Sequence, residues 1–129
     1  MLSDIPMIGG VKLTPLPASV LPSNMSVRAP VLNSEYGDEW AKAVTITGVR
    51  FMSAGEFAAA QAAVGQSGYA FREGSVGVVI VDAASSSGAF EVAEGSSVSI
   101  DSGEPLTVVR VTRCLHMDGT VHHWEIEVK

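Results

Sequence analysis

The stretch "LTVVRVTRCLHMDGTVHHWEIEV", residues 106–128, holds the only cysteine and all three histidines of the 129-residue chain. At its centre, Asp118-Gly119 is typical of a two-residue type I′ hairpin turn, because both residues tolerate the positive φ angles of that turn. Counting outward from the turn gives one polar face with these opposed pairs: His116–Val121, Cys114–His123, Thr112–Glu125 and Arg110–Glu127. The sequence therefore predicts an antiparallel C-terminal hairpin.

The other face of this predicted hairpin is apolar. The same register also places two polar residues on this face, with Arg113 opposite Trp124 and His122 opposite Leu115. A slip of one residue would scatter the apolar side chains over both faces, so the pattern supports the register. We expect Trp124 to be structural, and His122 to find a backbone partner near the turn. The predicted hairpin core consists of Val109, Val111, Leu115, Trp124, Ile126 and Val128.

The polar face raises the question of a metal site. Adjacent residues of a strand point to opposite sides, so His122 and His123 are not expected to bind one ion together. Cys114, His116 and His123 remain on one face and could hold zinc if a fourth ligand came from elsewhere. The chain has no second ligand pair such as C-x-x-C. We therefore expect no metal and no cofactor, with these three as the candidate ligands if a metal binds.

The rest of the chain also favours β structure. Short runs rich in β-branched residues, such as "AVTITGVRF" (43–51) and "VGVVIVDA" (76–83), alternate with turn-forming residues. This spacing predicts one mostly β domain over residues 1–129, a small antiparallel barrel or sandwich. Residues 1–23 contain four prolines, which interrupt backbone hydrogen bonding, and are expected to form an extended arm.

Residues 53–74 form an insert of different character. Ser53 and Glu56 match a capping box at the start of a helix. One face of this helix would carry Phe57, Ala60 and Val64. Gly65 is a plausible end of the helix. Two interpretations stay open. The insert is either a short helix packed over an open end of the β core, or a mobile loop that orders against another subunit.

Composition excludes several classes of function. The net charge is −6, with 14 acidic and 8 basic residues and no basic run, which argues against groove-type nucleic-acid binding. The sequence lacks a secretory signal pattern and an apolar run of about 20 residues, so we expect an intracellular protein without a membrane span. It also lacks a phosphate-binding loop, a dinucleotide fingerprint and a nucleophile elbow, so we expect no enzyme.

Several short motifs of the C-terminal half occur together. They are Glu94-Gly95 before a strand, the turn Ser102-Gly103-Glu104, the strand Leu106-Thr107-Val108-Val109 and the ending Val121-His122-His123-Trp124-Glu125. Together with "TITGVRF" (45–51), they resemble the minor capsid proteins of tailed bacteriophages and prophages over about two thirds of the chain. The Ala-rich insert and the Pro-rich arm depart from that family.

The resemblance implies a virion protein of the head–tail connector, a head-completion or stopper-like component. Such a subunit assembles in the host bacterial cytoplasm into a homo-oligomeric ring, binds portal, adaptor and tail proteins, and lets DNA pass without specific binding. We expect its contacts in the arm 1–23, the loop 33–42 and the insert 53–74. The tentative subunit or channel contacts are Glu56, Phe57, Gln61, Val64 and Tyr69.

Two alternatives stay open. One is a small β-barrel that binds a ligand or a metal on the polar hairpin face around Cys114, His116 and His123. The other is a small hydrolase that uses Asp or Glu with His123, although no nucleophile or oxyanion arrangement accompanies it.

Overall fold

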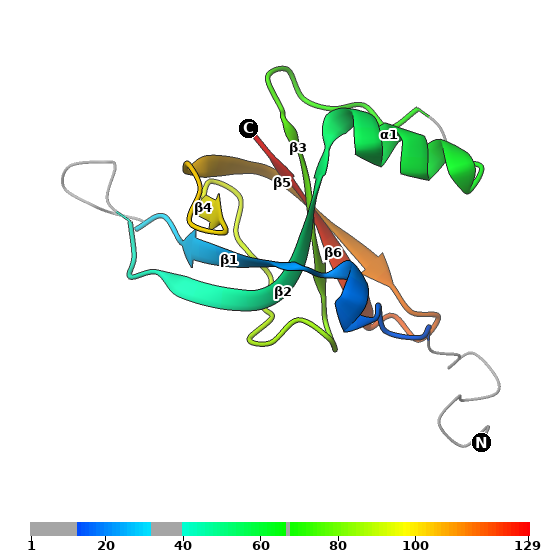
Figure 1. Ribbon diagram of the computed structural model, residues 1–129, viewed down its shortest axis with the longest axis horizontal. Coiled ribbons are helices and arrows are strands. Elements are labelled where there is room, and N and C mark those ends of the chain that lie inside the picture. The colour runs from blue at the N-terminus through cyan, green and yellow to red at the C-terminus, as the bar shows by residue number, and fades with distance from the viewer. Residues whose placement is uncertain (1–12, 32–39, 67) are drawn as a thin grey trace.

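The computed structural model describes residues 13–31, 40–66 and 68–129 of the chain. Six antiparallel strands close into a barrel in the order β1-β2-β3-β6-β5-β4 (Figure 1). The mostly β fold with one short helix is confirmed, and it is a barrel. The strands are β1 (Ser23–Arg28), β2 (Val44–Ser53), β3 (Gly77–Asp82), β4 (Ser97–Ile100), β5 (Leu106–Leu115) and β6 (Val121–Val128). The 3-10 helix η2 (Ala18–Val20) precedes β1, and the helix α1 (Ala54–Ala63) follows β2 directly.

Alternate side chains of the strands fill the barrel interior, as expected for a small closed barrel. Gly48, with φ of 87°, is skipped in the pairing of β1 with β2, so that Ile46 and Val49 both point inward although they are three residues apart. Val44, at the start of β2, is exposed. The buried core consists of Met25, Val27, Ile46, Val49, Val79, Val81, Val92, Val98, Val108, Trp124, Ile126 and Val128.

The middle of the C-terminal hairpin has the predicted register. The pairs Cys114–His123, Thr112–Glu125 and Arg110–Glu127 all occur between β5 and β6. A bulge between Val108 and Arg110 breaks the alternation toward the start of β5. As a result Val108 enters the core in place of the predicted Val109. Of the predicted hairpin core, Trp124, Ile126 and Val128 are buried there, and Val111 packs against them.

The turn itself differs from the prediction. The amide of Gly119 donates to the carbonyl of His116 (3.0 Å), and the amide of His116 donates to the carbonyl of Thr120 (2.8 Å). Gly119 has φ of 87°, whereas Asp118 keeps a negative φ. This is a three-residue loop closed by a glycine bulge, in place of the two-residue turn with two positive φ angles.

The longer loop shifts the pairing beside it. Leu115 pairs with Val121, so the predicted pairs of Val121 with His116 and of His122 with Leu115 are wrong. Leu115 is 50% exposed and lies outside the core, contrary to the prediction. The physical reason is the bulge between Cys114 and Leu115, which accommodates the extra loop residue.

The ends of α1 form as the sequence predicts. The hydroxyl of Ser53 accepts from the amide of Glu56 (3.2 Å), and the carboxylate of Glu56 accepts from the amide of Ser53 (2.9 Å). At the other end Gly65 has φ of 79°, and the amides at 65 and 66 donate back to the carbonyls of Ala62 and Gln61. The helix therefore begins with a capping box and ends in a Schellman motif.

The predicted packing face of α1 is wrong beyond the first turn. Phe57 is the only helix residue that is buried, Ala60 is exposed and Val64 is 70% exposed. Figure 1 shows α1 extending away from the barrel, with its start near β2 and β3. The helix does not cover an open end of the barrel.

Trp124 tests the inward register of β6. Its side chain is 8% exposed, packs in the core, and donates from Nε1 to the carboxylate of Glu91 at 3.1 Å. Trp124→Ala should lower the free energy of unfolding by about 3–5 kcal/mol, the usual cost of removing a buried large aromatic side chain. Urea denaturation measures this loss. Met117→Ala, at a 72% exposed position, is the control and should change stability little.

Candidate functional site

A second hydrophobic cluster lies outside the barrel wall. Val78 and Ile80 alternate along β3 with the inward Val79 and Val81, so they point outward, where they are buried beside Phe57. Phe57, Tyr69 and Phe71 contact one another edge to face, with ring centroids 4.8–5.9 Å apart. The insert therefore packs on the outer face of the sheet through its aromatic residues.

Glu127, on the same outer face, anchors the second half of the insert. Its side chain is completely buried. The carboxylate accepts hydrogen bonds from the Tyr69 hydroxyl (2.9 Å), the Arg72 amide (2.7 Å), the Ser75 hydroxyl and Arg110 Nε (3.0 Å). A buried carboxylate is stable only with such a full set of donors. Residues 69–75 are thus fixed to β5 and β6 by one charge.

The electrostatics of Glu127 follow from these contacts. Burial alone raises the pKa of Glu127, but the hydrogen bonds from Ser75, Arg72 and Arg110 outweigh burial and lower the pKa below its ordinary 4.5. Burial and the bond to this carboxylate raise the pKa of Tyr69 to about 12. At neutral pH the site therefore holds an ionised carboxylate and a neutral phenol.

Two of the three histidines hold the N-terminal arm. His116 Nδ1 accepts from the amide of Leu13 (2.9 Å), and His122 Nε2 donates to the carbonyl of Thr14 (2.8 Å). The predicted backbone partner of His122 is confirmed. The amide of Leu16 donates to Asp82 (3.1 Å), and its carbonyl accepts from Ser85 (2.6 Å). The described part of the arm is therefore fastened to the barrel.

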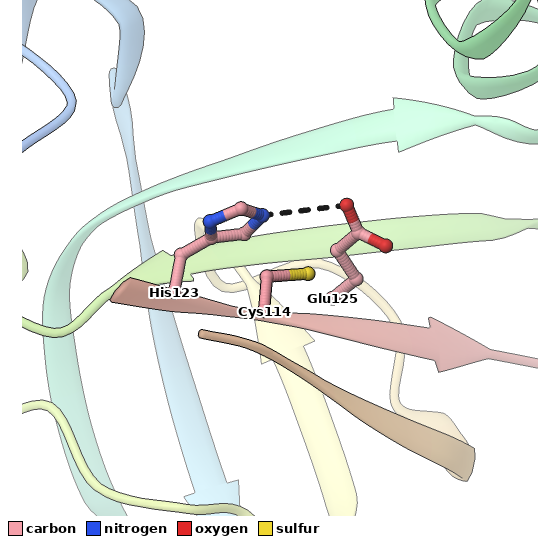
Figure 2. A group of neighbouring side chains, drawn as sticks. All are labelled: Cys114, His123 and Glu125. Carbon is pink, nitrogen blue, oxygen red and sulfur yellow. Dashed lines mark hydrogen bonds and ion pairs between the residues drawn. The ribbon is translucent and has the colours of Figure 1, made fainter. Parts of the chain in front are cut away.

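The structure brings together two of the three metal-ligand candidates, Cys114 and His123. Glu125 lies beside them in place of the third candidate, His116. Cys114 and His123 are paired across β5 and β6, and Glu125 joins them, with ligand atoms all within 4.8 Å of one another (Figure 2). His116 turns to the arm instead. The signal for Glu125 was present in the sequence, because residues two apart on a strand share a face and Glu125 follows His123 at that spacing.

The tandem histidines also differ from expectation. Their rings meet edge to face at 5.0 Å, and the two Nδ1 atoms lie 2.8 Å apart. Their side chains are therefore not separated by the strand as predicted. His123 Nε2 points the other way, toward Glu125 Oε2 at 3.3 Å.

The predicted subunit contacts divide into two groups. Phe57 is 3% exposed and Tyr69 is bonded to Glu127, so both are used within the subunit. Glu56 and Val64 are exposed and Gln61 is half-buried, which leaves these three at the surface. Arm residues 1–12 and loop residues 33–39 lie outside the described residues.

Comparisons with protein-family models, curated proteins and solved structures gave no match for this chain. Within the described ranges, no helix is long and apolar enough to cross a bilayer.

Glu127→Gln tests the anchoring role of the buried carboxylate. We expect a loss of about 3 kcal/mol in the free energy of unfolding, because breaking a buried, hydrogen-bonded ion pair leaves its partner uncompensated. Residues 69–75 should also exchange amide hydrogen faster, which mass spectrometry measures. Glu94→Gln, at an exposed position, is the matched control. Unchanged exchange in residues 69–75 would contradict the assignment.

The same carboxylate predicts a pH dependence. Because folding lowers the pKa of Glu127, its stabilising contribution is complete above the unfolded value of 4.5 and is lost as the pH falls through the lower folded value. Between about pH 6 and pH 3, wild-type protein should lose more stability than Glu127→Gln. Urea denaturation across this range measures both slopes, and equal slopes would mean that Glu127 does not titrate as described.

Proposed function

We propose that this chain is a non-catalytic structural subunit of the head–tail connector of a tailed bacteriophage. In this role it forms a ring around the DNA channel, between portal or adaptor proteins and the tail, as a head-completion or stopper-like component. The motifs of the C-terminal half supply the family resemblance. The observation that carries the proposal is the helix α1, which is folded but largely without a partner in the single subunit.

The helix α1 has the properties of a contact element. Isolated helices of about ten residues are marginal in water, so packing normally stabilises them. Yet α1 buries only Phe57 within the subunit, and its remaining surface is mainly alanine, followed by the exposed Val64. Small apolar side chains allow close approach of another chain. The proposed partner is a second copy of this protein, because a ring repeats one heterologous contact around its axis.

The net negative charge of the chain is compatible with a DNA channel. The chain carries a net charge of −6 and has no basic run. Repeated around a ring, negative charge repels phosphate, so DNA can move through the lumen without binding to it.

The test is the solution mass by light scattering, with and without the portal and adaptor proteins of the same phage. We expect addition of the portal and adaptor to produce a ring-sized complex. Ala59→Glu with Ala63→Glu places two charges on the exposed side of α1 and should abolish that complex, while lowering the free energy of unfolding by less than about 1 kcal/mol. Both positions are exposed.

Ala84→Glu, in the exposed turn after β3, is the matched control for added charge and should assemble as wild type does. Failure of the wild-type protein to join portal and adaptor would overturn the connector role. Normal assembly of the doubly charged variant would overturn the role of α1 in it.

A further inference from the structure

Cys114, His123 and Glu125 form a group of neighbouring side chains outside the barrel core. One side chain comes from β5 and two from β6, and Figure 2 shows all three facing one another on the same side of the hairpin. Their donor atoms, a sulfur, an imidazole nitrogen and a carboxylate oxygen, lie within 4.8 Å of one another. Sulfur, nitrogen and oxygen donors of these types are the zinc ligands of proteins.

The direction of the hydrogen bonds fixes where the imidazole protons lie. The carbonyl of Thr14 can only accept, so His122 Nε2 carries a hydrogen. In a neutral ring, His122 Nδ1 is then an acceptor, and the Nδ1 of His123, 2.8 Å away, must be the donor. His123 Nε2 is left with a lone pair.

That lone pair faces a second acceptor. His123 Nε2 lies 3.3 Å from Glu125 Oε2, and an ionised carboxylate has no hydrogen to donate. A metal ion placed between the two atoms would use the lone pairs of both.

The spacing of the imidazole and the carboxylate suits a metal ion. His123 Nε2 and Glu125 Oε2 lie 3.3 Å apart. Two ligand atoms bound about 2.0–2.1 Å from a tetrahedral zinc ion lie about 3.3 Å apart. The imidazole and the carboxylate thus already have the separation of two zinc ligands.

The charges of the three donors also suit zinc. Cys114 binds a zinc ion as a thiolate, so the thiol releases its proton on binding. Zn²⁺ with one thiolate, one carboxylate and one neutral imidazole is electrically neutral, which suits a half-buried position.

We propose that Cys114, His123 and Glu125 bind one zinc ion through three protein ligands. The fourth tetrahedral position is taken by water or by a donor atom from outside the subunit. His122 is the outer partner that orients His123, as the second ring nitrogen of a zinc-bound histidine usually requires. Through His122 the metal is linked to Thr14, so zinc also stabilises the attachment of the arm. This site is independent of the proposed connector role.

The test is metal titration of the full chain, purified without a histidine tag, reduced and stripped with EDTA. Co²⁺ replaces zinc as the probe, because a cobalt–thiolate bond gives a charge-transfer absorption. We expect one Co²⁺ per chain, displaced by Zn²⁺. Cys114→Ser should abolish the thiolate absorption. Loss of an outer-shell partner weakens metal binding by about 10–100-fold. Loss of a direct ligand, in His123→Gln or Glu125→Gln, should weaken cobalt binding by no less.

Glu104→Gln is the control, since Glu104 is exposed and lies outside the ligand group. It should bind cobalt as wild type does. Thermal unfolding in EDTA checks that each variant folds, and Cys114→Ser, nearly isosteric, keeps the test valid if His123→Gln does not fold. Absence of saturable binding would overturn the proposal, as would wild-type affinity in both Cys114→Ser and Glu125→Gln.

Discussion

The ion pair between Glu127 on β6 and Arg110 on β5 is the interaction on which the outer face of this barrel depends. A carboxylate without any exposed surface must be matched by donors, and four different residues provide them. Arg110 also donates to the carbonyl of Ala70 and lies 4.7 Å over the ring of Tyr69. One buried charge therefore holds the hairpin and the second half of the insert in a single arrangement.

The barrel carries two attached segments, which are held by different chemistry. The insert is held by the aromatic contacts of Phe57, Tyr69 and Phe71 and by the buried charge of Glu127. The arm is held by hydrogen bonds from its backbone to His116, His122, Asp82 and Ser85, with Leu16 as its apolar contact to the outer cluster. Hydrophobic contacts and a buried charge make the first attachment strong, whereas the second depends mainly on polar contacts near the surface.

The proposed zinc ligands lie between these two attachments. Glu125 is two residues from Glu127 on the same face of β6, and His123 reaches the arm through His122 and Thr14. The hairpin thus joins the arm to the insert, whose helix α1 is the proposed contact with other subunits. A cation at this point would stiffen the arm without touching the barrel core, which consists of apolar side chains inside the wall.

The sequence by itself determined the β class, the middle register of the last hairpin, the capping box and the glycine end of α1, because each depends on neighbouring residues and on alternation along one strand. Tertiary structure decided what local patterns do not contain. The bulges beside Val108 and Cys114 moved Val109 and Leu115 out of the core, since barrel closure and loop length together set which residues face inward. The environment of Glu127 also required tertiary contacts, because its donors at Tyr69, Arg72 and Ser75 lie more than fifty residues away. Likewise, His116 lies outside the predicted ligand group because its ring accepts a hydrogen bond from a backbone amide of the arm, about a hundred residues earlier in the chain.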